Sequence, residues 1–441
     1  MTNRNFILLI IILAIIVLGF FGFLYFKRDA VPPGESPGGT NFLSQFNPFA
    51  GTSVKPPVTE PPADISGTEP PPVERGLQLM KVSSMPVAGY GVFMKERYKE
   101  VVAEITESSA LTAEGGIPPE AVAPPTEFAP ALRYVDRATG NIYQTFADKI
   151  EERKFSVTVI PKVYEALFSG SGETVIMRYL KGNGQTIETF VGKLPKEVLG
   201  GDSTAENEVK GTFLPVGVKD ISLAPDGQSI FYLFETGENT IGTILDFATD
   251  KKTQIFDSAF NEWLSFWPNS KMITLTTKPS YLAPGYLYTL NPSTKSFIQA
   301  LGEIPGLTTL ASPDGKMALV ANNTLALSIY RLDTKISESL GVRTLPEKCA
   351  WGKTSDVIYC AAPRLVTSAN YPDTWYQGEV SFEDQIWKIN VETGSASIIL
   401  DPAVASTGEE VDGIKLALDE GENYLFFVNK KDSFLWRVEL K

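Results

Sequence analysis

Short runs of alternating apolar and polar residues, separated by tight-turn tripeptides, recur along the second half of the chain. Two clear examples are "SLAPDGQSIFYLF" at 222–234 and "LASPDGKMALVA" at 310–321. Alternation with a period of two predicts half-buried β-strands. Pro-Asp-Gly between two such runs predicts a hairpin, because proline presets φ and glycine accepts a positive φ. The pattern therefore predicts a series of antiparallel hairpins.

The hairpin turns recur at similar spacing. Equivalent turn positions fall at 172, 227, 270, 315 and 355, which are 55, 43, 45 and 40 residues apart. Such an interval accommodates four short strands, and repeats of this size are typical of β-propeller blades. The stretches that fit the template are 162–194, 218–257, 263–301, 307–340, 348–400 and 413–441.

The two ends of the repeat array complete the count. The last stretch, 413–441, supplies only three strands, whereas the run "LQLMKVSS" at 77–84 has no hairpin partner of its own. Pairing 77–84 as the outer strand of the last blade leaves no open sheet edge, as a ring requires. With a first blade between 89 and 160, the sequence predicts an all-β fold, a seven-bladed β-propeller closed by an N-terminal strand. Six or eight blades are the alternatives, because the first blade is the least regular.

Two segments of different character precede the repeats. Residues 6–26 form an uninterrupted apolar run of 21 residues, which as a helix would span about 31 Å and match a bilayer core. A cleaved signal peptide is the alternative, although bulky residues occupy the place of a small-residue cleavage site. Residues 29–75 contain eleven prolines and predict an extended linker. We therefore expect a transmembrane anchor at 1–28, a Pro-rich disordered linker at 29–75 and a propeller domain at 76–441.

Composition excludes several classes of function. The chain of 441 residues contains no histidine, which rules out Ser-His-Asp triads, Cys-His dyads and His-ligated zinc. Its formal net charge of −13 argues against nucleic acid as a partner, since phosphates would be repelled. The residue types favour a protein that is not an enzyme, without deciding the question.

The chain has two cysteines, Cys349 and Cys360, which flank a predicted hairpin with its midpoint between Thr354 and Ser355. In that register the two cysteines face each other on neighbouring strands, close enough to form a disulfide. Two unrelated core thiols are the alternative. A disulfide would place the domain outside the cytoplasm, so we expect a single-pass cell-membrane protein with a cytoplasmic N-terminus and an extracytoplasmic propeller.

Two connections between second and third strands of a blade carry candidate binding residues. The insertion at 363–384 in blade six and the segment 276–288 in blade four lie on the face where propellers usually bind ligands. Large aromatic side chains on a loop are typical of binding hot spots; packing of the loop onto its own propeller is the alternative. The candidates are Tyr371, Asp373, Trp375, Tyr376, Tyr281 and Tyr286.

Four acidic residues lie seven or eight positions before the turns, at the start of the predicted innermost strands, and Asp412 lies near the same level. A ring of carboxylates beside the central channel could hold Ca²⁺ or a cationic group; solvated acids at a wide pore mouth are the alternative. No other cofactor or metal is predicted. The members of this acidic ring are Glu165, Asp220, Glu262, Glu347 and Asp412.

The turns "APDG" and "SPDG", with "DFATDKKTQ" and "NVETGSAS" closing their blades, resemble the WD40-like repeats of TolB-type β-propellers over about 160–441. The resemblance implies the propeller fold, an envelope role and protein partners. We therefore expect a membrane-tethered scaffold that binds an envelope protein or a glycan. One alternative is a carboxylate-based glycosidase or lyase with acids at the channel mouth, and another is a structural envelope protein without a defined ligand.

Overall fold

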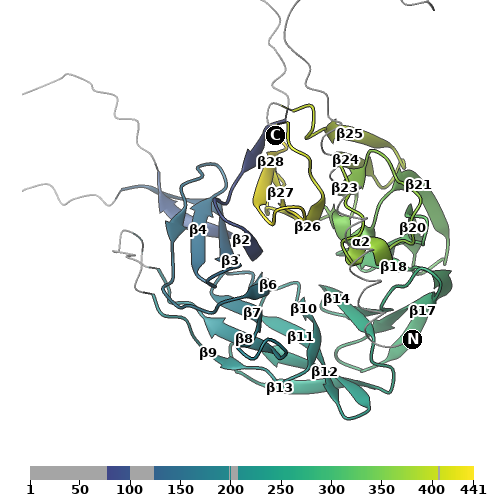
Figure 1. Cartoon of the computed structure of the whole chain (residues 1–441), viewed down its shortest axis with the longest axis horizontal. Coiled ribbons are helices and arrows are strands. Elements are labelled where there is room, and N and C mark those ends of the chain that lie inside the picture. The colour runs from purple at the N-terminus through teal and green to yellow at the C-terminus, as the bar shows by residue number, and fades with distance from the viewer. Residues whose placement is uncertain (1–76, 100–123, 198, 200–206, 406–407) are drawn as a thin grey trace, which may run out of the picture. The chain divides into compact units, whose positions relative to one another are not determined.

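A computed structural model describes residues 77–99, 124–197, 199, 207–405 and 408–441. These residues belong to one compact unit, Val73–Lys441. They form seven four-stranded antiparallel sheets arranged as the blades of a ring (Figure 1). The predicted seven-bladed β-propeller is therefore confirmed.

Blades 1 to 4 each run from the innermost to the outermost strand in chain order. Blade 1 contains β2 (Val87–Tyr98), β3 (Thr126–Asp136), β4 (Ile142–Phe146) and β5 (Arg153–Lys154). Blade 2 contains β6 (Val163–Phe168), β7 (Thr174–Leu180), β8 (Ile187–Lys193) and β9 (Lys210–Phe213). Blade 3 contains β10 (Val218–Leu223), β11 (Ser229–Thr236), β12 (Asn239–Asp246) and β13 (Lys252–Ser258). Blade 4 contains β14 (Trp263–Asn269), β15 (Met272–Thr277), β16 (Pro284–Leu290) and β17 (Phe297–Pro305).

The remaining blades follow the same order, with one exception at the end of the chain. Blade 5 contains β18 (Thr308–Ala311), β19 (Met317–Ala321), β20 (Ala326–Arg331) and β21 (Ser337–Arg343). Blade 6 begins after the 3-10 helix η2 (Pro346–Lys348) and contains β22 (Cys349–Trp351), β23 (Val357–Pro363), β24 (Asp384–Asn390) and β25 (Ala396–Leu400). Blade 7 contains β26 (Gly413–Leu418), β27 (Tyr424–Asn429), β28 (Leu435–Glu439) and, as its outermost strand, β1 (Leu79–Lys81).

The ring closes where the sequence predicted. β1 pairs antiparallel with β28, with Leu79 opposite Val438 and Met80 opposite Arg437. Beyond the strand, the N–H of Val82 donates to the Leu435 carbonyl at 2.7 Å. This closure joins the two ends of the propeller, which would otherwise expose an unpaired sheet edge.

The repeated turns position the blades against each other. Gly227 has a φ of +66°, which non-glycine residues rarely adopt. A Cβ at this position would also lie 2.1 Å from the backbone nitrogen of Gly170 in the neighbouring turn. The Pro-Asp-Gly turn at 225–227 is therefore needed for close packing of blades 2 and 3.

The core consists of apolar layers between neighbouring blades. Between blades 3 and 4, for example, Phe231 and Leu233 pack with Trp263, Trp267 and Ile273. This arrangement follows from the sheet order, since each blade presents its apolar side chains to the next blade.

The two ends of the innermost strands define two faces of the propeller. We call the face that carries the hairpins between first and second strands the turn face, and the opposite one, with the blade 6 insertion 364–383, the insertion face. No helix in the described part of the chain is long and apolar enough to cross a bilayer. The predicted anchor at 1–28 and the linker at 29–75 lie outside the described residues.

The predicted disulfide is present. Cys349 on β22 lies directly opposite Cys360 on β23, and a disulfide joins them. Both side chains are buried, at 4% and 0% exposure. The alternative of two unrelated thiols is therefore not what the structure shows.

Candidate functional site

The blade 6 insertion, residues 364–383, connects β23 to β24 on the insertion face. It contains the short helix α2 (Asp373–Tyr376), which is drawn inside the ring in Figure 1. Four residues are too few for a helix to be stable alone, so its position depends on the contacts that its side chains make with the propeller.

The predicted aromatic residues of this loop divide into two groups. Tyr371 and Trp375 are 2% and 3% exposed and form an apolar cluster with Phe382, Leu325 and Leu345. Trp375 stacks on Phe382 with ring centroids 6.1 Å apart. These two aromatic side chains pack the loop onto the propeller, the alternative left open by the sequence, and are not exposed to a partner.

A buried ionic cluster lies beneath Trp375. Lys348, which is fully buried, pairs with Asp412 and, at 2.8 Å, with Asp384. The indole Nε1–H of Trp375 donates to Asp412 at 3.0 Å, and so does the backbone N–H of Phe382, also at 3.0 Å. We call Lys348, Asp384 and Asp412 the buried cluster. It fastens the inserted loop to blades 6 and 7.

In the buried cluster, burial and the neighbouring charges shift the pKa values in opposite directions. Burial disfavours the charged form of Lys348, but Asp384 and Asp412 outweigh it and hold the Lys348 pKa above its ordinary value. Burial alone would raise the pKa of Asp412, but Lys348 and the hydrogen bonds from the loop bring it below the ordinary value. For Asp384 burial dominates and raises the pKa to about 6. One oxygen of Asp384, Oδ1, has no hydrogen-bond partner among the described residues.

A second acidic group lies at the edge of the loop. The hydroxyl of Tyr376 donates to Glu347 Oε2 at 3.1 Å. The other oxygen of Glu347 is buried and has no partner among the described residues. Burial raises the pKa of Glu347 to about 7, although Tyr376 and the nearby lysines Lys348 and Lys430 act in the opposite direction.

Asp373 connects the two predicted binding loops. It accepts hydrogen bonds at 3.2 Å from the hydroxyl of Ser280 and from the backbone N–H of Tyr281. The carbonyl of Tyr281 in turn accepts from Asn323 at 3.1 Å. Loops of blades 4, 5 and 6 are thereby joined, as the grouping of 276–288 with 363–384 on one face anticipated.

Several apolar side chains stay exposed on these joined loops. Leu282 is 82% exposed, Leu365 is 76% exposed and Tyr376 is 41% exposed. Tyr286 is half-buried. The insertion face therefore presents apolar side chains on loops that buried contacts hold in place.

The predicted acidic ring is not a ring of free carboxylates. Glu165 pairs with Arg178 at 2.7 Å, and Glu262 pairs with Lys278 at 3.1 Å. Asp220 accepts hydrogen bonds from the backbone N–H and the hydroxyl of Ser265, each at 2.6 Å. With Glu347 bonded to Tyr376 and Asp412 to Lys348, each member has its own local partner.

This pairing corrects the expectation of a shared cation site. The described residues contain no group of three or more Asp, Glu or Cys side chains placed to hold a metal ion. Burial raises the pKa of Asp220 to about 6, against the hydrogen bonds from Ser265. The acids at the channel therefore act chiefly as local structural partners.

Sequence reasoning missed Lys348, Asp384 and Arg178. Lys348 stands directly beside the predicted Glu347, in the short segment before a strand, and Asp384 is the first residue of β24. The available signal was weak, because Asp384 opens a strand that also contains polar residues and Arg178 lies within a mostly apolar strand. The partners themselves come from other strands, so spacing could not pair them.

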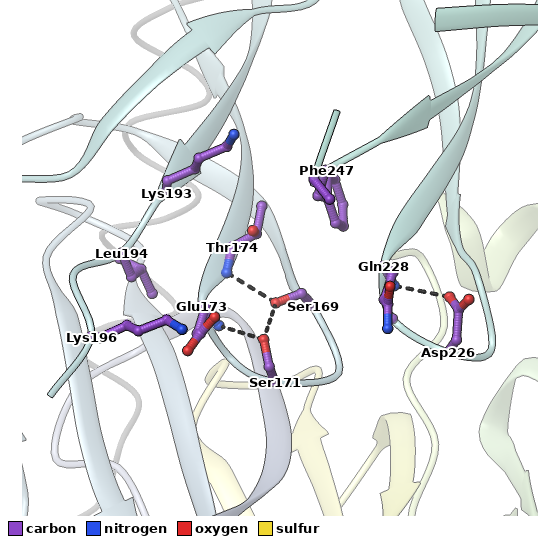
Figure 2. Close-up of a pocket in the computed structure, with 12 residues that line it drawn as sticks. Ser169, Ser171, Glu173, Thr174, Lys193, Leu194, Lys196, Asp226, Gln228 and Phe247 are labelled. Carbon is purple, nitrogen blue, oxygen red and sulfur yellow. Dashed lines mark hydrogen bonds between the residues drawn. The ribbon is translucent and has the colours of Figure 1, made fainter. Parts of the chain in front are cut away.

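A polar pocket of about 470 Å³ lies on the turn face between blades 2 and 3. Figure 2 shows the turns around Ser169 and Asp226 on its two sides, with Phe247 near the second. The Ser169 hydroxyl accepts from the Thr174 N–H at 2.9 Å, and Asp226 accepts from the Gln228 N–H at 2.9 Å. These polar groups stabilise their own turns, as short polar side chains in turns commonly do.

Comparisons with known proteins find similarity among solved structures only. No protein family model matches it, and no curated protein sequence matches it. Among solved structures, it is similar to an oligogalacturonate lyase in complex with manganese, with 9% identity, a TM-score of 0.48 and coverage of 70% of this chain and 85% of that one. An oligogalacturonate lyase from Vibrio parahaemolyticus gives 9% identity, a TM-score of 0.47 and coverage of 70% and 86%.

A third similar structure is TolB from Acinetobacter baumannii, with 11% identity and a TM-score of 0.38. The match covers 69% of this chain and 61% of that chain. The propeller fold that the resemblance to TolB-type repeats implied is shown by the seven four-stranded sheets of this chain. At such low identity the similarity does not extend to an activity.

Proposed function

We propose that this protein is a binding scaffold that holds a partner protein on its insertion face. The observation that carries the proposal is the combination of a loop fixed by the buried cluster with exposed Leu282, Leu365 and Tyr376. Loops that are ordered before binding lose less conformational entropy in the complex.

The exposed residues favour a protein over a glycan. Leucine side chains offer no hydrogen bonds to sugar hydroxyls, whereas they bury well against apolar side chains of a partner. Tyr376 adds an aromatic ring of the type enriched at protein interfaces. The binding experiment must therefore distinguish a protein partner from a glycan.

We further propose that the propeller is extracytoplasmic and tethered to the cell membrane through residues 6–26. The support is the Cys349–Cys360 disulfide, since disulfides persist mainly outside the cytoplasm, together with the apolar run at 6–26. Thiol labelling of denatured protein taken directly from cells tests this. We expect labelling only after reduction; free thiols without reductant would contradict the location.

The binding proposal is tested by cross-linking the propeller to extracytoplasmic proteins. Leu282→Asp and Leu365→Asp place charges on the proposed interface, whereas Ile298→Asp changes an equally apolar, 61% exposed residue of β17. We expect a specific set of partners that is lost in the first two variants and retained in the third. Equal loss in all three, or retention in all, would contradict an interface on this face. Parallel binding to a glycan array that depends on the same residues would favour a glycan.

An enzyme acting on glycans is a second candidate, favoured by one observation. The carboxyl of Asp220 has a pKa raised to about 6 by burial beside the channel, within the range that suits general acid catalysis. A screen for glycan degradation should then show an activity that Asp220→Asn removes and Glu262→Gln retains. Absence of activity in the wild type, or equal activity in both variants, argues for the scaffold.

A further inference from the structure

The innermost strands of blades 3 to 7 end around an apolar pocket at the channel mouth on the turn face. The pocket has a volume of about 400 Å³, within the range of small-molecule sites. Its walls include Phe266 of β14, Leu310 of β18, Trp351 of β22 and Leu416 of β26. Because these strands belong to different blades, the pocket exists only where the blades pack side by side in the folded propeller.

Several apolar side chains that line the pocket are partly accessible to solvent. Phe266 is 38% exposed, and Leu310, Trp351, Leu416 and Ala417 are half-buried. Trp351 already uses its indole N–H, which donates to the Leu310 carbonyl at 3.2 Å. Removing such surface from water is favourable, and an apolar ligand of matching size would do so.

The charged groups around the pocket indicate which ligand charge the pocket favours. Lys353 is the charged residue that lines it. The Lys353 ammonium lies 3.3 Å from Glu420, and its backbone N–H donates to Glu422 at 2.8 Å. The rim therefore holds a cation beside two carboxylates and favours neither a strongly cationic nor an anionic group inside.

We propose that this channel mouth binds a neutral apolar molecule, either a small ring system or a medium-length alkyl chain. The inference is independent of the proposed partner on the insertion face, because the pocket opens at the other end of the innermost strands. Its ligand class follows from apolar walls contributed by several blades and from a rim whose lysine is balanced by acids.

The neutral fluorophore N-phenyl-1-naphthylamine is a direct probe, because its emission rises in apolar surroundings. Residues 73–441 serve as the protein, since they form a closed propeller with its own core. We expect saturable binding of one molecule per chain. Ala417→Phe fills the pocket and should weaken binding about tenfold or more, and Phe266→Ala removes part of the wall and should weaken it several-fold. Ile298→Ala, on the outer surface, is the matched control and should leave binding unchanged.

Displacement of the probe then tests the charge argument. n-Decanol should displace it at lower concentration than decanoate or decyltrimethylammonium, which have the same chain length but carry a charge. Absence of saturable binding overturns the proposal, as does binding that both pocket variants leave unchanged. Equal displacement by the charged compounds overturns the assigned ligand class. Since Phe266 is partly exposed, Phe266→Ala keeps the test valid if Ala417→Phe does not fold.

Discussion

Lys348 shows how a single buried charge holds the inserted loop in place. Its ammonium lies between Asp384 and Asp412, and all three side chains are fully buried. Asp412 also accepts from Trp375 and from the Phe382 backbone in the inserted loop. Removing the lysine would leave two carboxylates without a counter-ion in a dry environment, which is costly.

We therefore expect Lys348→Met to lower the free energy of unfolding by about 3–5 kcal/mol, measured by urea denaturation of residues 73–441. Lys353→Met is the matched control, because Lys353 also pairs with an acid but is 69% exposed. Its loss should cost about 0–1 kcal/mol. Similar effects of the two substitutions would contradict the role given to the buried cluster.

The pH dependence of stability follows from the raised carboxyl pKa values. Burial raises the pKa of Asp384 to about 6 and that of Glu347 to about 7, both above the values in an unfolded chain. The native state therefore binds protons more strongly, and the stability that protonation provides is lost as pH rises through 6 and 7. We expect the urea midpoint of the wild type to fall between pH 5 and pH 8.

Substitution identifies the groups responsible for this slope. Glu347→Gln keeps an acceptor for Tyr376 but cannot ionise, so it should flatten the decline between pH 6 and pH 8. Glu262→Gln changes an exposed acid whose side chain is 50% accessible and should leave the slope unchanged. An unaltered slope in Glu347→Gln would contradict the assignment of that proton to Glu347.

The sequence located several of these residues but not their partners. Glu347 and Asp412 were placed beside the channel from their distance to the turns. Their contacts with Tyr376 and Lys348 depend on how the inserted loop folds back. The burial of Tyr371 and Trp375 has the same origin, since composition alone does not distinguish an aromatic residue that packs from one that binds.

At the level of elements, hairpins were the most predictable features. The disulfide register, with Cys349 opposite Cys360, followed from the strand alternation and the turn position. Helix α2 was not predicted, because four residues carry little helical signal and tertiary contacts hold them. Local patterns thus predict the strands, whereas insertions depend on the surface that they cover.

The disulfide closes a short loop within blade 6, with a sequence separation of 11. Constraining a loop of that size in the unfolded chain stabilises the native state by about 3 kcal/mol. We expect the double variant Cys349→Ala/Cys360→Ala to lose about that amount in calorimetry. The wild type under strong reductant should approach the variant, whereas the variant should not respond to reductant. Stability equal to that of the oxidised wild type would contradict a structural role for the bond.

At the scale of the whole molecule, both proposed surfaces depend on how the blades are arranged in the ring. The insertion face needs blades 4 to 7 in fixed order, and the apolar pocket needs the innermost strands of blades 3 to 7 to converge. β1 completes blade 7 and thereby closes the ring (Figure 1). The sequence predicted this closure from a simple count, since one strand was missing at the end and one was unpaired at the start.

Cross-linking of β1 to β28 tests this closure most directly. Met80→Cys and Arg437→Cys introduce thiols at directly opposed positions, and the native disulfide is too buried to exchange readily. Mild oxidation of the double variant should give an intramolecular cross-link between the first and last strands of the propeller, found by mass spectrometry of its peptides. A control pair, Met80→Cys with Phe297→Cys on β17, should stay reduced. Failure of the first pair to cross-link, or equal cross-linking in both, would contradict the closed propeller.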